Sequence, residues 1–202
     1  MRDQKPKRRS QLERSQETRA RLLNATLEII DECGWSASSM QRICERAGVS
    51  RGAQTHHFPT RESLLIASVR EIVNRYQFDL MHQDRRELTL HAFFDFLWDA
   101  TFNDSLLTCW VEAMVAARTD PVLKQQVQVT DAAAIAAMKT IGVECASGSE
   151  LVSTPNHISD IVELTVYLLR GMKVQDCLNV NREERQRLFQ VWKSLIAEYP
   201  PT

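Results

Sequence analysis

The sequence predicts an all-α protein in two parts, a small N-terminal domain over residues 12–60 and a larger helical domain over residues 61–202. Apolar side chains recur every three or four residues in one segment after another, which places them on one face of a helix. Gly, Pro, Asn and Asp residues separate these segments, at positions where helices begin or end. The chain has 202 residues and is 44% hydrophobic, so it can bury one large core or two modest ones.

The first predicted helix covers residues 16–33 and ends at Gly34. Its apolar stripe includes Leu22, Ile29 and Ile30 at helical spacing. The residues before it are polar and charged, with lysines and arginines clustered around Pro6, so they have little apolar surface with which to fold. We expect either a disordered solubilising tail or an arm that contacts nucleic acid.

Two short helices are predicted on either side of Gly48. Ser38 and Gln41 have the spacing of a capping box and would start the first. Gly48 would end it, because glycine tolerates the left-handed backbone found at helix C-termini. Ser50 would cap the second, which runs from Arg51 to His57. Two helices joined by a three-residue turn with glycine predict a helix-turn-helix unit, whose second helix enters the DNA major groove.

The same signals divide the rest of the chain into further helices. Thr60 is the expected cap of the next one, and Asp120 and Pro121 the expected cap and first residue of a later one. The predicted segments are a helix over 60–80, two helices within 87–119 with a break near 103–104, a helix over 120–145, a surface loop over 147–156, a helix over 157–174, and a last helix that Asn181 and Glu184 cap.

Charge is distributed unevenly along the chain. Residues 1–61 carry 12 Lys and Arg against 7 Asp and Glu, whereas residues 62–202 carry 13 against 19, although the whole chain has a net charge of −1. A basic part joined to an acidic part indicates that nucleic-acid binding is confined to the N-terminal domain. No apolar run is long enough to cross a bilayer, and the basic start lacks the apolar stretch of a secretion signal. We therefore expect a cytoplasmic protein without a membrane partner.

The N-terminal motifs resemble the DNA-binding domain of TetR-type (TetR/AcrR) transcriptional regulators. The resemblance rests on AGVSRGA at residues 47–53 and HHFPTR at residues 56–61, and extends from Leu22 to Leu65, roughly a quarter of the chain. It departs from the family in one place: Gln54 and Thr55 stand where the family often has Leu-Tyr. That tyrosine commonly contacts the DNA backbone, so the family's operator preference does not carry over.

Eight residues are predicted to contact DNA. Arg51, Gln54 and Thr55 are placed on the exposed face of the second helix, where Arg can bind guanine, Gln can bind adenine and Thr can meet a thymine methyl. Gln41 matches a family position that reaches the groove, a role in conflict with capping Ser38. The remaining four are Gly52, for close backbone approach, and Ser39, His56 and Arg61, for phosphates.

The C-terminal domain is predicted to bind a small molecule and to form a homodimer. Aromatic and methionine side chains gather between residues 87 and 119, where they form either ordinary core or the lining of an apolar pocket. The predicted ligand-binding residues are Phe94, Trp98, Trp110, Met114 and Met138. The last two helices carry more apolar surface than one packing face needs, which favours a four-helix interface between two copies, as in the family resembled.

The resemblance implies a one-component transcriptional regulator, most simply a repressor that a small-molecule effector releases from a palindromic operator. Two alternatives remain: a redox-responsive regulator that uses some of the five cysteines, and an architectural DNA-binding protein without an effector. We expect no enzyme, cofactor or metal, because the sequence has no phosphate-binding loop, nucleophile elbow or metal-ligand pair. His56 and His57 are adjacent, so on a helix they point about 100° apart and cannot chelate one ion.

Overall fold

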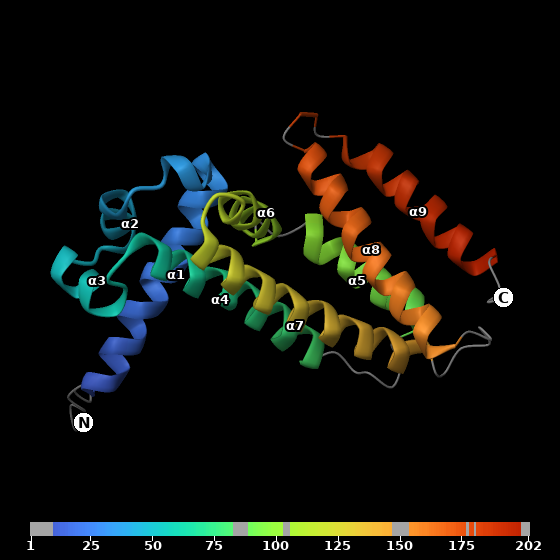
Figure 1. Ribbon diagram of the computed structural model, residues 1–202, viewed down its shortest axis with the longest axis horizontal. Coiled ribbons are helices and arrows are strands. Elements are labelled where there is room, and N and C mark those ends of the chain that lie inside the picture. Colours follow the sequence, from blue (N-terminus) through green and yellow to red (C-terminus); the bar gives the residue numbers. More distant parts are fainter. Residues whose placement is uncertain are drawn as a thin grey trace, which may run out of the picture. The chain divides into compact units, whose positions relative to one another are not determined.

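The computed structural model describes residues 10–82, 89–102, 106–146, 154–176, 178–179 and 181–198 (Figure 1). Within these ranges the chain is helical and contains no strand, which confirms the all-α fold class. The helices are α1 (Gln11–Ala37), α2 (Met40–Ala47), α3 (Arg51–His57), α4 (Arg61–His82), α5 (Leu90–Phe102), α6 (Leu106–Ala117), α7 (Pro121–Ala146), α8 (Pro155–Gln175) and α9 (Arg182–Glu198).

The chain divides into two compact units, residues 1–68 and residues 69–202. This division falls within α4, whereas the sequence placed a domain boundary at residues 60–61. One helix therefore supplies residues to both units.

The first helix starts earlier than predicted, at Gln11 instead of residue 16. Ser10 and Glu13 form a capping box, in which the Glu13 N–H donates to Ser10 Oγ at 3.1 Å and the Ser10 N–H donates to Glu13 Oε2 at 2.7 Å. Gly34 interrupts the helix as expected, with φ 73° and ψ 167°. The polar residues that were predicted to form a tail or arm lie mainly outside the described residues.

The core of the first unit joins α1, α2 and the start of α4. Its buried members are Leu22, Leu23, Ala25, Ile29, Ile43, Ala47, Phe58 and Leu64. These residues come from α1, α2 and α4, together with the residue that ends α3, and include Leu22 and Ile29 of the stripe predicted for residues 16–33. A core of this size stabilises a domain only modestly, so polar contacts between the helices matter here.

Most of the predicted helix caps are present. The hydroxyls of Ser50 and Thr60 accept from the N–H groups of Ala53 and Ser63, at 3.2 and 3.0 Å. Asp120 Oδ1 accepts from Val122 and Leu123, and Asn181 Oδ1 accepts from Glu184.

The predicted capping box at Ser38 is wrong. Ser39 caps α2 through the Arg42 N–H, at 3.2 Å, because Ser38 is buried and its hydroxyl donates to the Trp35 carbonyl at 2.7 Å. Two other expectations cannot be compared with the structure: the helix break at 103–104 and most of the loop over 147–156 lie outside the described residues.

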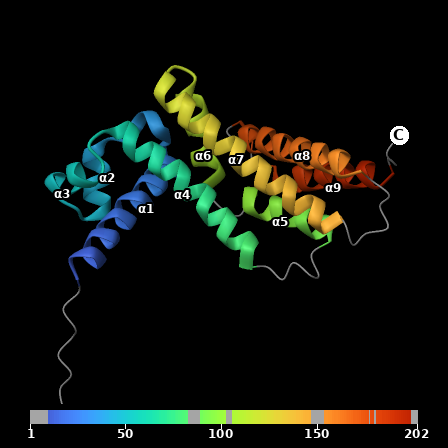
Figure 2. The same ribbon diagram turned by 60° about the horizontal axis from the view of Figure 1, so that its bottom comes forward.

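The core of the second unit is formed by α5, α7, α8 and α9. Figure 2 shows α7 and α8 lying side by side over much of their length. Between α8 and α9, Trp192 Nε1 donates to Thr165 Oγ1 at 3.0 Å. The buried apolar residues of this core are Leu90, Phe93, Phe94, Leu97, Trp98, Ile141, Cys145, Ile158, Ile161, Val162, Leu169, Phe189 and Ile196.

Close packing of α7 against α8 depends on Gly142. A Cβ atom built there would lie 2.4 Å from Val162 Cγ2 and 3.5 Å from Phe93 Cε1. Val162 is completely buried and β-branched, so its side chain has little freedom to move away.

None of the described helices is long and apolar enough to span a lipid bilayer.

We predict that Gly142→Ala lowers the free energy of unfolding by about 1–3 kcal/mol, because the added methyl overpacks the contact between α7 and α8. Urea unfolding followed by circular dichroism measures this change. Gly171→Ala in α8 is the control: nothing lies within 4 Å of its added Cβ, so the gain in helix propensity should stabilise by up to about 1 kcal/mol. Equal destabilisation by both substitutions would contradict a packing effect.

Candidate nucleic-acid interface and interior cavity

The turn between α2 and α3 is built on left-handed backbone at Gly48, with φ 60° and ψ 41°. The Gly48 N–H donates to the Glu45 carbonyl and the Val49 N–H to the Cys44 carbonyl, at 3.1 and 3.0 Å. From α1, Arg21 Nη2 donates to the Gly48 carbonyl at 2.9 Å. The positive φ favours glycine here, whereas the Arg21 nitrogen, 2.6 Å from a Cβ built on Gly48, ends a flexible side chain that can move away.

One face of α3 is exposed and consists of Arg51, Gly52, Thr55 and His56. Their spacing of three or four residues places them together on the helix surface. The Thr55 hydroxyl donates to the Arg51 carbonyl at 2.9 Å, within the helix. Nothing lies within 4 Å of a Cβ built on Gly52, so another molecule can approach the backbone closely there.

The prediction that Gln54 lies on the exposed face of α3 is wrong. Its side chain is 5% exposed, and its amide nitrogen donates to the Phe58 carbonyl. The physical reason is helical spacing: Gln54 shares the inner side of α3 with His57 and Phe58, three and four residues further on. Burial and the neighbouring charges of His56 and Arg19 lower the pKa of His57.

Arg61 is turned inward, away from the phosphate-binding role predicted for it. Its guanidinium carbon lies 4.0 Å from the centre of the Trp35 ring, and Nη2 donates to the Trp35 carbonyl and to Ser38 Oγ. Burial lowers the pKa of Arg61. Arg61 therefore connects the start of α4 to the end of α1, because a guanidinium stacks well on an aromatic face.

Ser39 and Gln41 are exposed near the start of α2, as their predicted roles require. Ser39 is occupied as the helix cap, whereas Gln41 Nε2 donates to Glu45 Oε1 at 2.9 Å. Gln41 therefore does not cap Ser38, and its conflict between two roles disappears. A shallow open groove runs past Gln41, Glu45, Gly48, Val49, Ser50 and Arg51, along the turn.

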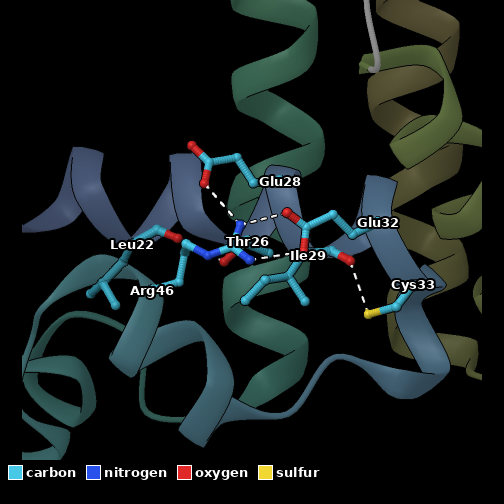
Figure 3. Close-up of polar contacts among 7 residues, drawn as sticks. All are labelled: Leu22, Thr26, Glu28, Ile29, Glu32, Cys33 and Arg46. Carbon is cyan, nitrogen blue, oxygen red and sulfur yellow. Dashed lines mark hydrogen bonds and ion pairs between the residues drawn. The ribbon is translucent and has the colours of Figure 1, made fainter.

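An ion-pair cluster that was not predicted holds α2 against α1. Arg46 in α2 makes two parallel contacts of 2.8 Å to the Glu32 carboxylate and one of 3.2 Å to Glu28 (Figure 3). The guanidinium of Arg46 lowers the pKa of Glu32 by donating to it. All three side chains are at least one-third exposed, so the cluster orients α2 more than it stabilises the fold. The sequence feature that could have indicated this cluster is the four-residue spacing of Glu28 and Glu32, which places both carboxylates on one face of α1.

The described cysteines give no support to the redox alternative. Cys44, Cys109 and Cys145 are buried, and burial raises the pKa of the Cys44 thiol, which disfavours the reactive thiolate. Cys33 is half-buried, with its thiol donating to the Ile29 carbonyl at 3.1 Å.

The second unit contains an apolar cavity between α4, α5, α6, α7 and α8. Its volume is about 60 Å³, which is room for a few water molecules. Its lining comprises Ile72, Val73, Phe96, Leu97, Ala100, Thr101, Leu107, Trp110, Ala134, Met138, Val166, Leu169 and Arg170.

Two of the five predicted ligand-binding residues, Trp110 and Met138, line this cavity. Phe94 and Trp98 instead fill the core, where the Trp98 ring stacks on Phe189 with centroids 5.1 Å apart. Met114 is 41% exposed and is not part of the lining. Phe94, Trp98 and Met114 differ from the prediction because the faces of α5 and α6 that carry them do not face the cavity.

Three polar side chains line the cavity. The Thr101 hydroxyl donates to the Leu97 carbonyl at 2.7 Å, and Arg170 Nη2 contacts Asp131 Oδ1 at 2.6 Å. Trp110 Nε1 is buried and has no hydrogen-bond partner among the described residues. Arg170 was not predicted from the sequence as a lining residue. It lies four residues after Val166 and next to Leu169, both of which line the cavity.

The helices α2 and α3 are joined by a turn at Gly48, and α3 is short and exposed on one face. This arrangement defines the first unit as a helix-turn-helix domain. Residues 22–75 match the family of bacterial regulatory proteins named tetR. Over 133 residues, the chain is 35% identical to the HTH-type transcriptional regulator CymR of Pseudomonas putida, covering 62% of this chain and 63% of CymR. The chain thus spans less than two thirds of that curated relative. These matches show that the N-terminal part of the chain is similar to the DNA-binding domain of tetR-family regulators.

Two solved structures show that the fold is shared beyond the first unit. A transcriptional regulator from Rhodococcus sp. Rha1 has a TM-score of 0.72 at 19% identity, over 88% of this chain and 95% of its own. A TetR-family regulator from Cytophaga hutchinsonii has a TM-score of 0.73 at 17% identity, over 97% of this chain and 100% of its own.

We predict that Gln54→Ala destabilises the protein by about 1–3 kcal/mol, because it leaves the Phe58 carbonyl without its partner and opens space inside the domain. Urea unfolding measures this loss. Thr55→Ala, at the exposed neighbouring position, should change stability by less than about 0.5 kcal/mol. In the folded Gln54→Ala protein, preference among DNA sequences should be unchanged; a relaxed preference at one base pair would show that Gln54 turns outward to read DNA.

Proposed function

We propose that this protein is a homodimeric transcriptional repressor that binds a palindromic operator and is released from it by a small-molecule effector. The observation that carries the proposal is the exposed face of α3, which places Arg51, Thr55 and His56 beside an accessible backbone at Gly52. The names of the curated relatives, HTH-type transcriptional regulators, support a regulatory rather than an enzymatic role. Such a protein acts in the cytoplasm, where bacterial DNA is found.

We assign recognition of the DNA bases to Arg51 and Thr55 of α3 and to Gln41 of α2. Arg51 has no ion-pair partner among the described residues, so its guanidinium is available for the paired acceptors of guanine. The Thr55 hydroxyl is engaged by the Arg51 carbonyl, which leaves its methyl group for a thymine methyl. His56 and Ser39 are assigned to phosphates, which fix position rather than sequence.

Dimerisation is assigned to α8 and α9. Both helices expose large apolar side chains that water disfavours, and an isologous pairing of two such helix pairs would bury them in a four-helix arrangement. The exposed apolar residues of these helices are Leu164, Tyr167, Val174, Leu188, Val191 and Leu195.

The effector site is assigned to the cavity of the second unit. Ile72 and Val73 of α4 form part of its wall, and Leu64 of the same helix lies in the core of the first unit. A ligand that displaces the wall would therefore act on a helix that the DNA-binding unit shares. The cavity also favours a ligand-responsive regulator over an architectural DNA-binding protein, which needs no interior site.

The DNA-binding role is tested by finding which genomic fragments the purified protein protects from nuclease. We predict that Arg51→Ala lowers affinity for the protected operator by about 1–3 kcal/mol and relaxes preference at one guanine. Thr55→Ala, one turn further along the same face, should relax preference at a thymine. If the wild-type protein protects no fragment in preference to others, the proposed regulatory role fails.

Leu195→Glu in α9 should convert the dimer into a monomer, because each protomer would bury an unpaired carboxylate in the apolar interface. Sedimentation equilibrium at micromolar concentration measures this change, and operator affinity should fall with it. Val129→Glu in α7 is the control, since Val129 is also exposed but lies on neither interface helix. If the Leu195→Glu protein is still a dimer, the interface does not include this part of α9.

A further inference from the structure

Gln41 and Glu45 lie one turn apart on the exposed side of α2. Gln41 Nε2 donates to Glu45 Oε1 at 2.9 Å. Both side chains line the open groove at the turn, together with Arg51 of α3. The groove thus places one carboxylate next to two side chains that we assign to DNA bases.

The carboxylate of Glu45 determines how the Gln41 amide is turned. A carboxylate has acceptors and no donor, so the amide can approach it only with its NH₂ group. This settles which end of the amide is nitrogen, an assignment that is ambiguous where the partner can both donate and accept. The amide oxygen, Oε1, therefore points away from Glu45, and it accepts no hydrogen bond from the described residues.

An amide oxygen presented in this way recognises only some bases. In the major groove adenine and cytosine present amino groups, whereas guanine O6 and thymine O4 are acceptors. Gln41 Oε1 can accept from the amino groups and is repelled by the oxygens. The second N–H of the amide is still available for the N7 atom of a purine, which makes adenine the better match of the two.

The hydrogen bond between Gln41 and Glu45 is exposed to water in the free protein, where such a pair contributes little. Against DNA it becomes more important, because hydrogen bonds strengthen where water is excluded. A reversed amide would turn Oε1 toward the Glu45 carboxylate and leave two acceptors facing each other. Glu45 therefore disfavours the orientation that would recognise guanine or thymine.

We infer that Gln41 reads the amino group of adenine or cytosine through Oε1, and that Glu45 is the positioning residue that imposes this choice. Glu45 acts through Gln41 and need not contact DNA itself. This inference deepens the proposed function, since it rests on the assignment of Gln41 to base recognition and gives the class of base that is recognised.

The test uses the full-length protein and duplexes selected from a randomised library. The base pair whose preference is lost in Gln41→Ala is the one that Gln41 reads. The adenine or cytosine of that pair is then replaced by an analogue without the amino group, purine for adenine or 2-pyrimidinone for cytosine. Wild type should bind the analogue duplex about tenfold more weakly than the natural one, and Gln41→Ala should bind both about equally.

Three variants test the role of Glu45. In Glu45→Gln the new amide can both donate and accept, so the Gln41 amide can turn and the loss for the analogue should fall to about threefold. Exchanging the pair, with Gln41→Glu and Glu45→Gln together, leaves an acceptor at the first position and a donor at the second, so the full loss should return. Asp31→Asn removes the same charge from an exposed position of α1 and should leave the loss unchanged.

The inference is overturned if wild type binds the analogue as tightly as the natural base, or if Glu45→Gln leaves the loss unchanged. It is also overturned if Glu45→Gln weakens binding to both duplexes equally, as a structural role would. If the library yields no enriched sequence, specific DNA binding and the proposed function fail as well. If sequences are enriched but no base pair depends on Gln41, this inference fails alone.

Discussion

The left-handed backbone at Gly48 sets the path from α2 into α3, and the exposed face of α3 depends on it. With seven residues, α3 is too short to be stable as an isolated helix. It is held at its start by this turn, which Arg21 binds from α1, and at its end by the carbonyl of Phe58, which Gln54 binds. A helix that makes few contacts of its own is thus positioned from both ends.

Polar contacts between helices supplement the small core of the first unit. Gln54 ties the end of α3, Arg61 stacks on Trp35 to tie α4 to α1, and Arg46 joins α2 to two glutamates of α1. Each of these contacts orients one helix relative to another, which an apolar core alone does with less directional precision. The geometry of the DNA-facing surface therefore depends on side chains that need not contact DNA.

Helical period and capping chemistry were enough to predict the all-α fold, the turn at Gly48 and the caps at Ser50, Thr60, Asp120 and Asn181. They failed where two neighbouring residues offer the same chemistry, as with Ser38 and Ser39, because only packing decides which of them is buried. Gln54 was placed on the exposed face of the second helix because its amide can bind adenine, and the Phe58 carbonyl that it binds instead is not visible in the sequence.

The cavity shows the same limit. An excess of aromatic side chains predicts either core or pocket, but which of Trp98 and Trp110 lines a pocket depends on how α5 and α6 are rotated against α7 and α8. Rotation of this kind is set by the packing of all four helices together and has no signal within any one of them. Arg170 was missed because it is a charged residue within a predicted core stripe.

Three arginines of the first unit that bind other protein groups also change how its charge should be understood. Arg46 is neutralised by glutamates, Arg61 covers an indole ring, and Arg21 is bound to a backbone carbonyl. Each phosphate contact releases condensed counterions from DNA, but only a cation that reaches a phosphate can do so. Among the described residues, the formal count of arginines therefore overstates the number of counterions released, and DNA affinity should depend on ionic strength less steeply than that count suggests.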